Sequence, residues 1–246
     1  MNNLSEKVIV VTGGSGLIGR AIIDDLLLNN ATVINLDINK YDKETKFINT
    51  NTTDLSSIQE AFNLVEQEFG KIDGLVNNAY PRTIDWGTAL EDDTNLNSWR
   101  ENVDLQMNSY VLCCKEVLPF LKRNKEGSVI NITSIYGVVG NDFTIYEGTG
   151  LKTAAAYSAI KGGLINFSRY MASFYGKDKI RFNCISPGGI FDGQHEVFVK
   201  NYEHKVPMKR MGNPQDIAPS VSFLMSDGAK YITGINLMVD GGWTCI

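Results

Sequence analysis

The chain has 246 residues, 43% of them hydrophobic, and a formal net charge of −5, so it can bury a sizeable core as one large α/β domain or two small ones. The acidic balance, without a basic block, argues against nucleic acid as the main partner. No apolar stretch approaches the ~20 residues of a membrane span, and the first six residues do not form a signal peptide. Four cysteines without a C-x-x-C motif or a histidine cluster favour reduced thiols in a cytoplasm and no metal site.

A glycine-rich turn follows the first predicted strand. The strand covers residues 7–12, a β-branched and almost wholly apolar run that is typical of a strand buried on both faces of a parallel sheet. Gly14, Gly16 and Gly19 then fit the pattern G-x-G-x-x-G, and an apolar-periodic helix continues through Leu28. Such glycines let the backbone approach a pyrophosphate, which the helix N-terminus stabilises. We therefore expect a dinucleotide site to which this turn contributes Gly13, Ser15, Gly16, Leu17, Ile18 and Gly19.

The second predicted strand favours NAD over NADP as the cofactor. It covers residues 31–36 and ends at Asp37, close to the position at which a carboxylate meets the ribose hydroxyls of a bound adenosine. That carboxylate would repel a 2′-phosphate, and neither Ile38 nor Ser15 supplies a positive charge to attract one. A solvated aspartate at a strand end is the alternative.

Strand and helix patterns alternate along the rest of the chain. A helix that opens after Asp54 carries its apolar residues on one stripe and closes at Gly70. Further helices are expected over residues 99–121, 157–175 and 214–225, and further strands over residues 75–79, 127–134, 180–186 and 235–239. This alternation implies right-handed crossovers and one doubly wound parallel sheet.

Tyr157 and Lys161 are a candidate catalytic pair. Four residues apart on a helix, they share one face, so an ammonium can lie beside a phenol. Bringing a tyrosine from its free pKa of about 10 to near 7 needs about 4 kcal/mol of preferential stabilisation of the phenolate, and a neighbouring lysine has the right sign to supply it. In isolation such a pair is more often a solvated helix face, but the dinucleotide motif upstream favours the functional interpretation.

These motifs, taken in order, resemble the short-chain dehydrogenase/reductase family over nearly the whole chain. The resemblance implies hydride transfer with NAD(P) on a single Rossmann-type domain over residues 1–246. It also implies about seven strands in the order 3-2-1-4-5-6-7, helices on both faces, a small substrate lid at about residues 190–212, and a homotetramer or homodimer. The matching segments are the glycine turn, Asn77-Asn78-Ala79, Ser134 upstream of Tyr157 and Lys161, Asn183-x-x-Ser186-Pro187-Gly188, residues 210–214, and Ile232-Thr233-Gly234 before Asp240-Gly241-Gly242.

The resemblance also implies roles for individual residues. Tyr157 would be the acid/base for the reacting oxygen, Lys161 would stabilise its phenolate and bond the nicotinamide ribose, and Ser134 would hold the substrate oxygen. The other implied cofactor contacts are Asn51, Thr52, Asn78 and Ala79, with Asn77, on the adenosine side, and Pro187, Gly188 and the backbone of Ile190 around the nicotinamide.

Several residues depart from the family pattern. Gln106 stands where an asparagine normally completes the proton relay, and Asn108 is close enough that the sequence leaves open which of them, if either, holds the relay water. Tyr80 replaces a glycine, and Asp192 replaces a threonine after the Pro-Gly segment. Leu17 stands at a glycine position, and Asn51 stands where an aspartate usually receives the adenine amino group.

The segment from Gly137 to Ala156 is about ten residues longer than usual and follows a strand at the ligand-binding edge, where long loops carry specificity or cover the site. An oligomer contact or a surface loop is the alternative. Within it, Tyr146 is a candidate substrate residue, together with Asp192. Arg82 is a third, because a guanidinium binds phosphate or carboxylate bidentately; an ordinary exposed arginine is nearly as good an interpretation.

Three segments point to a substrate class. Residues 78–82, 145–149 and 188–192 resemble oxidoreductases associated with flagellin modification and sialic-acid-like sugar synthesis. That subgroup implies a polar, phosphorylated or nucleotide-linked amino sugar, oxidised or reduced at a secondary alcohol or ketone with NAD(H). The alternatives are a reductase of 3-oxoacyl chains and, from another class, a cofactor-binding regulator without catalysis.

Overall fold

Seven parallel strands form one sheet in the computed structural model, which describes residues 3–41, 45–150 and 153–246. The strand order β3-β2-β1-β4-β5-β6-β7 confirms the expected topology. The third strand is the one that the sequence patterns did not locate. The strands are β1 Val8–Thr12, β2 Thr32–Asp37, β3 Lys46–Asn49, β4 Gly74–Asn77, β5 Gly127–Ile132, β6 Ile180–Pro187 and β7 Asn236–Val239.

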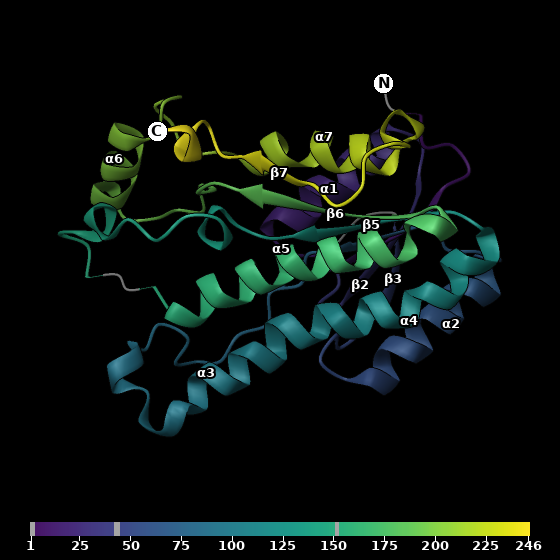
Figure 1. Cartoon of the computed structure of the whole chain (residues 1–246), viewed down its shortest axis with the longest axis horizontal. Coiled ribbons are helices and arrows are strands. Elements are labelled where there is room, and N and C mark those ends of the chain that lie inside the picture. The colour runs from purple at the N-terminus through teal and green to yellow at the C-terminus, as the bar shows by residue number, and fades with distance from the viewer. Residues whose placement is uncertain (1–2, 42–44, 151–152) are drawn as a thin grey trace.

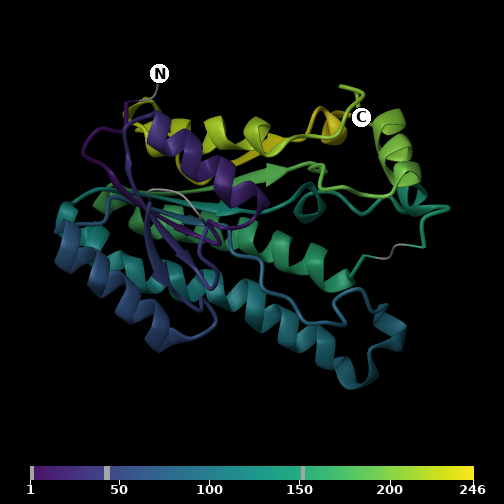
Figure 2. The ribbon, with the colours of Figure 1, turned by 180° about the vertical axis from the view of Figure 1, so that it is seen from behind.

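Helices cover both faces of the sheet, as a doubly wound fold requires (Figures 1 and 2). One face carries α1 (Leu17–Leu28) and α7 (Pro214–Met225), and the other carries α2 (Leu55–Phe69), α4 (Ser109–Asn124) and α5 (Ala155–Tyr175). Two shorter helices, α3 (Asn97–Asn102) and α6 (Glu196–Lys205), lie beyond the end of the sheet toward which β5 and β6 point. Within the described residues, no helix has the length and apolar character needed to cross a membrane.

The core lies in two layers, one on each face of the sheet. Successive side chains of a strand point to opposite faces, so Val8 and Val10 of β1 pack in the layer under α2 and α4 while Ile9 and Val11 pack in the layer under α1 and α7. Because both faces are buried, β1 is apolar at every position but its last, Thr12, which is the pattern that identified it.

The helix expected over residues 99–121 contains a π-helical turn, Val103–Asn108, between α3 and α4. A π turn inserts one extra residue per turn, so it rotates the side chains that follow it relative to a regular helix. Hydrophobic periodicity does not reveal such an insertion. Here it turns Gln106 into the interior and leaves Asn108 exposed.

The long segment after β5 packs against α6. Its 3₁₀ turn Phe143–Tyr146 lies beside the helix, and Asn201 of α6 donates through Nδ2 to the carbonyl oxygens of Ile145 and Glu147, both at 3.3 Å. Asp142 and Lys205 form an ion pair across the same contact. Residues 151–152 of the segment lie outside the described residues.

The segment that was expected to form a lid begins and ends at one point. Ile190 and Gly212 form an isolated parallel bridge, so residues 190–212 leave and rejoin the body of the protein side by side. Between them, α6 packs through Phe198 and Tyr202 on a small cluster that also includes Trp243 near the C-terminus.

Candidate active site

A cavity of about 940 Å³ opens along the carboxyl ends of the strands. Parallel doubly wound sheets bind ligands at this edge, where the strand order reverses, because the backbone ends of neighbouring strands diverge there. Most of the residues expected from the sequence line this cavity. They are Gly13, Ser15, Gly16, Leu17, Ile18, Asp37, Asn51, Thr52, Asn78, Ala79, Ser134, Tyr146, Tyr157, Lys161, Pro187, Gly188, Ile190 and Asp192.

The glycine turn is packed too closely for side chains at two positions. Gly13 has a positive φ of 64°, and a Cβ there would lie 2.6 Å from the Cα of Ala79. A Cβ at Gly19 would lie 2.2 Å from the carbonyl oxygen of Gly13. Gly19 is buried and does not line the cavity, so it serves the turn by letting α1 approach it. The turn presents bare backbone to the cavity, as phosphate binding requires.

The carboxylate of Asp37 is held at one end of the cavity. Its two oxygens accept hydrogen bonds from the backbone N–H groups of Ser15, at 2.9 Å, and Asn39, at 3.0 Å. Arg20, which the sequence reading did not single out although it directly follows the glycine turn, also lines this end. Its guanidinium donates to the carbonyl oxygen of Ser15 at 2.7 Å and lies over the ring of Tyr41.

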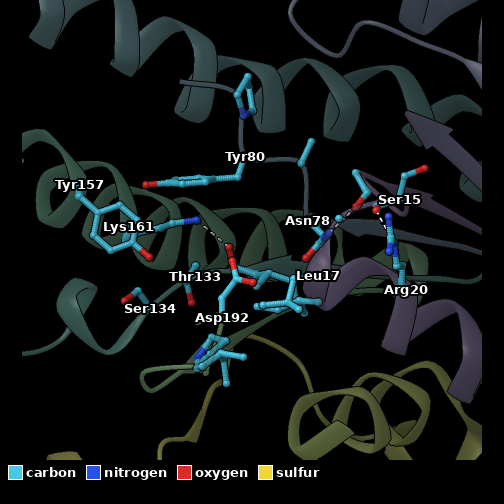
Figure 3. Close-up of a pocket in the computed structure, with 18 of the residues that line it drawn as sticks. Ser15, Leu17, Arg20, Asn78, Tyr80, Thr133, Ser134, Tyr157, Lys161 and Asp192 are labelled. Carbon is cyan, nitrogen blue, oxygen red and sulfur yellow. Dashed lines mark hydrogen bonds between the residues drawn. The ribbon is translucent and has the colours of Figure 1, made fainter. Parts of the chain in front are cut away.

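Ser134, Tyr157 and Lys161 meet at the other end of the cavity (Figure 3). Ser134 lies two residues after the buried end of β5, and Tyr157 and Lys161 lie on the first two turns of α5. Lys161 is only 5% exposed, and its Nζ donates to the carbonyl oxygen of Ile132 at 3.0 Å. The segment after β5 and the first turns of α5 therefore bring a hydroxyl, a phenol and an ammonium to one wall.

Burial shifts the pKa of both ionisable groups away from charge. Loss of hydration raises the pKa of Tyr157, and the neighbouring hydroxyl of Ser134 opposes that rise. Loss of hydration also lowers the pKa of Lys161 to about 8. The ammonium is therefore still charged at neutral pH, and burying its charge lowers the stability of the folded protein.

Gln106, rather than Asn108, points inward from the π turn. It is 2% exposed, its Nε2 lies 3.5 Å from Oδ1 of Asn102, and its Oε1 has no hydrogen-bond partner among the described residues. Asn108 is exposed and donates to Asp104 at 2.8 Å. Gln106 does not itself line the cavity.

Two other expected contacts lie outside the cavity wall. Arg82 is exposed and does not line the cavity; its guanidinium lies 5.6 Å from the centroid of the Tyr80 ring. Asn77 is fully buried and donates to Oδ1 of Asn131 at 2.9 Å, so it supports the sheet and does not face the adenosine side. Aromatic residues that the sequence analysis gave no site role complete the wall: Tyr80, Tyr110, Tyr136, Phe198 and Tyr202.

Comparison with known proteins agrees with this geometry. Residues 17–244 match a family model described as enoyl-(acyl carrier protein) reductase. The chain belongs to the short-chain dehydrogenase/reductase family. This is a family of oxidoreductases.

Three members of the family show how far the similarity extends. Post-translational flagellin modification protein A of Campylobacter coli is 32% identical, covering 98% of this chain and 99% of that protein. The 3-oxoacyl-[acyl-carrier-protein] reductase of Escherichia coli is 31% identical, covering 98% of each. A short-chain dehydrogenase from Leptospira borgpetersenii, solved with bound NAD+, is 35% identical with a TM-score of 0.90, covering 98% of this chain and 94% of that one.

The buried ammonium predicts that Lys161→Met stabilises the protein while removing a site residue. A lysine pKa lowered from 10.5 to about 8 corresponds to about 3 kcal/mol, and methionine keeps the apolar chain. Tyr110 still donates to the Ile132 carbonyl oxygen, at 3.4 Å. We expect urea unfolding at pH 7 to show a gain of about 1–3 kcal/mol.

The stability that Lys161→Met gains over the wild type should shrink as pH rises from about 8 to 10.5. In that window the folded wild type has released the Lys161 proton while the unfolded chain still holds it, so wild-type stability increases with pH. Lys200→Met, at an exposed lysine of α6, is the control and should change stability by less than about 0.5 kcal/mol at either pH. If the wild type is more stable than Lys161→Met at pH 7, burial of the ammonium does not cost the stability inferred here.

Proposed function

We propose that this protein transfers a hydride between NAD(H) and a secondary alcohol or ketone of a polar, phosphorylated or nucleotide-linked amino sugar. The observation that carries the proposal is the meeting of Ser134, Tyr157 and Lys161 at one end of a cavity that has Asp37 at its other end. An acid/base set at one end and a ribose-binding carboxylate at the other suit a dinucleotide that spans the cavity.

The residues present fit NAD(H). A cavity of about 940 Å³ is large enough for a ligand of that size, and the crowded glycine turn offers bare backbone to a pyrophosphate. Asp37 would accept from the adenosine ribose hydroxyls, with Asn51 and Thr52 near the adenine. The backbone around Pro187, Gly188 and Ile190 would receive the nicotinamide. The Leptospira family member with bound NAD+ supports the same choice.

Bound NAD(H) supplies or accepts the hydride, and the protein has to move a proton at the same oxygen. Tyr157 would take that proton when an alcohol is oxidised and return it when a ketone is reduced. Ser134 would hold the oxygen by a hydrogen bond, and Lys161 would favour the phenolate through its positive charge. Gln106, whose amide oxygen has no hydrogen-bond partner within the described part of the chain, is the residue that would hold a relay water.

The substrate end of the cavity mixes polar groups with ring faces, as sugar sites do. Tyr136 and Tyr146 bring phenol groups, and Asp192 brings a carboxylate that could pair with a substrate amine. Arg82 remains the candidate for a substrate phosphate, which would have to extend beyond the cavity wall to reach it. The relative from Campylobacter coli modifies flagellin by its name, which agrees with the subgroup whose resemblance suggested an amino-sugar substrate.

A 3-oxoacyl chain is the second candidate substrate. Ile145 and Phe198 give part of the wall an apolar character that an acyl chain could use, and the Escherichia coli relative acts on such a substrate by its name. An acyl carrier protein is acidic, however, and a surface with a net charge of −5 does not favour its docking. The set Ser134, Tyr157 and Lys161 argues against the third possibility, a regulator without catalysis.

A homo-oligomer, a tetramer or dimer, is also part of the proposal. Tyr170 and Phe174 lie one turn apart on α5 and stack with their ring centroids 6.1 Å apart while 63% and 50% exposed. Large apolar side chains exposed together on a helix commonly mark a protein interface.

The cofactor assignment predicts that NADH binds at least about tenfold more tightly than NADPH, a difference of about 1.4 kcal/mol. Repulsion between Asp37 and a 2′-phosphate is the cause, so Asp37→Asn should narrow the difference. Titration of cofactor fluorescence measures both affinities. Equal affinities in the wild type would overturn the assignment of Asp37.

The catalytic assignment predicts NADH oxidation or NAD+ reduction with at least one compound in a panel of amino-sugar phosphates and nucleotide-linked amino sugars. Tyr157→Phe should bind NADH normally but lose about 10²- to 10⁴-fold in turnover, because the ring remains and the transferable proton is gone. Each substrate is paired with its dephosphorylated analogue, and acetoacetyl-thioester is included. Turnover of the thioester alone would show that the substrate is a 3-oxoacyl chain and not a sugar. Full activity in Tyr157→Phe would show that another residue is the acid/base.

A further inference from the structure

Two aromatic rings, those of Tyr80 and Trp86, pack edge to face on the candidate acid/base Tyr157 and on each other. The ring centroids of Tyr80 and Tyr157 are 5.9 Å apart, those of Trp86 and Tyr157 are 6.0 Å apart, and those of Tyr80 and Trp86 are 6.0 Å apart. The interplanar angles lie between 78° and 84°. Each ring therefore restrains the other two, in the geometry that aromatic pairs prefer.

The Lys161 ammonium lies among aromatic rings. Its Nζ is 5.7 Å from the centroid of Tyr80, 5.4 Å from that of Tyr110 and 5.7 Å from that of Tyr157. Ring faces attract a cation, so these contacts compensate for part of the hydration free energy that the ammonium loses on burial. Figure 3 shows the Tyr80 ring lying over the Lys161 amine, with its hydroxyl directed toward Tyr157.

The loop that carries Tyr80 and Trp86 is anchored to α3. Thr83 donates its backbone N–H to Oδ1 of Asn102 at 3.1 Å and accepts from Nδ2 of the same residue at 2.7 Å. Ser98 donates to Asp85 at 3.1 Å. Trp86 also packs on a buried cluster that includes Ile160 of α5. These contacts hold the aromatic wall in place without a ligand.

We propose that Tyr80 is a positioning residue of the active site: braced by Trp86, its ring fixes the Tyr157 ring and shields the Lys161 ammonium from water. This role depends on the function proposed above in one respect only, namely that Tyr157 and Lys161 are catalytic. A glycine at this position, as in the family pattern, would leave that side of both groups open. The substrate must then reach Tyr157 from the side of Tyr146 and Asp192.

Tyr80 does not compete with Tyr157 as the base. Burial, followed by the neighbouring Tyr157, raises the pKa of Tyr80 well above that of a free tyrosine, so Tyr80 keeps its proton at neutral pH. The contribution of Tyr80 is therefore its ring and its bulk. Tyr80→Phe preserves both, whereas Tyr80→Gly removes both.

Chemical labelling of Lys161 tests the shield without any substrate. The protein is acetylated with an N-hydroxysuccinimide ester at pH 8, and peptide mass spectrometry compares Lys161 with the exposed Lys200 as internal reference. We expect Tyr80→Gly to raise the relative rate at Lys161 about tenfold or more, because a protected group becomes accessible. Tyr80→Phe should keep the wild-type rate, as should Tyr231→Gly, the same substitution at a tyrosine that is fully exposed outside the cavity.

An unchanged Lys161 rate in Tyr80→Gly would overturn the proposal. If circular dichroism shows that this variant has lost its fold, Tyr80→Ala is measured in its place with the same expectation. Because no substrate is used, the outcome stands whether or not the sugar panel succeeds.

Kinetics on the substrate that the panel identifies separate positioning from simple support of the fold. In Tyr80→Gly, kcat should fall about tenfold to a hundredfold, because Tyr157 and Lys161 lose their fixed geometry, while KM changes less. Tyr80→Phe should restore kcat. A loss of kcat in Tyr80→Phe that equals the loss in Tyr80→Gly would assign the effect to the hydroxyl and contradict the role of the ring.

Discussion

The buried ammonium of Lys161 is the constraint on which the site depends. A charge that is 5% exposed has lost nearly all of its water, and its one hydrogen bond described here goes to a backbone carbonyl oxygen, that of Ile132. A carboxylate beside it would stabilise it more strongly, but would also cancel the positive charge that Tyr157 needs. Ring faces attract a cation without supplying a full negative charge, so they lower the cost of burial and leave the charge available.

The fold gathers this arrangement from distant parts of the sequence. Parallel strands end at one edge of the sheet, so Ser134 beyond β5, the loop after β4 and the backbone of β6 meet beside the first turns of α5. The long segment after β5 adds Tyr146 to the same wall, and its ion pair with Lys205 ties it to α6. Rigid elements hold the acid/base set, while the parts that border the substrate come from loops, where relatives can differ without losing the fold.

Much of the fold and site could be predicted because each predicted feature has a local cause. Strand β1 is buried on both faces and is apolar up to Thr12, and the crowded turn at Gly13 and Gly19 tolerates no side chain, so each of these features gives a recognisable sequence pattern. Strand β3 has four residues, of which Ile48 alone is buried, so its sequence shows almost no strand pattern. The π turn was not predicted because one inserted residue shifts the apolar stripe by less than one turn and does not end the helix.

Other site features depend on where a side chain points. Asn77 belongs to the same face of β4 as the core residue Leu75, so alternation turns it toward Asn131 and away from the cavity. Tyr80 was visible as an unusual residue, but its contacts with Trp86 and Lys161 come from a loop whose course only the structure gives.

The most direct test of the account is the ionisation of Tyr157 with and without NAD+. Phenolate absorption near 295 nm, taken as the difference between the wild type and Tyr157→Phe, reports this one tyrosine as pH is raised. Without the cofactor, burial should hold its pKa above that of a free tyrosine. With saturating NAD+, Tyr157 would face a second positive charge beside Lys161, and its pKa should fall below the free value of about 10. A pKa that stays above the free value with NAD+ bound would contradict Tyr157 as the base and Lys161 as the group that prepares it.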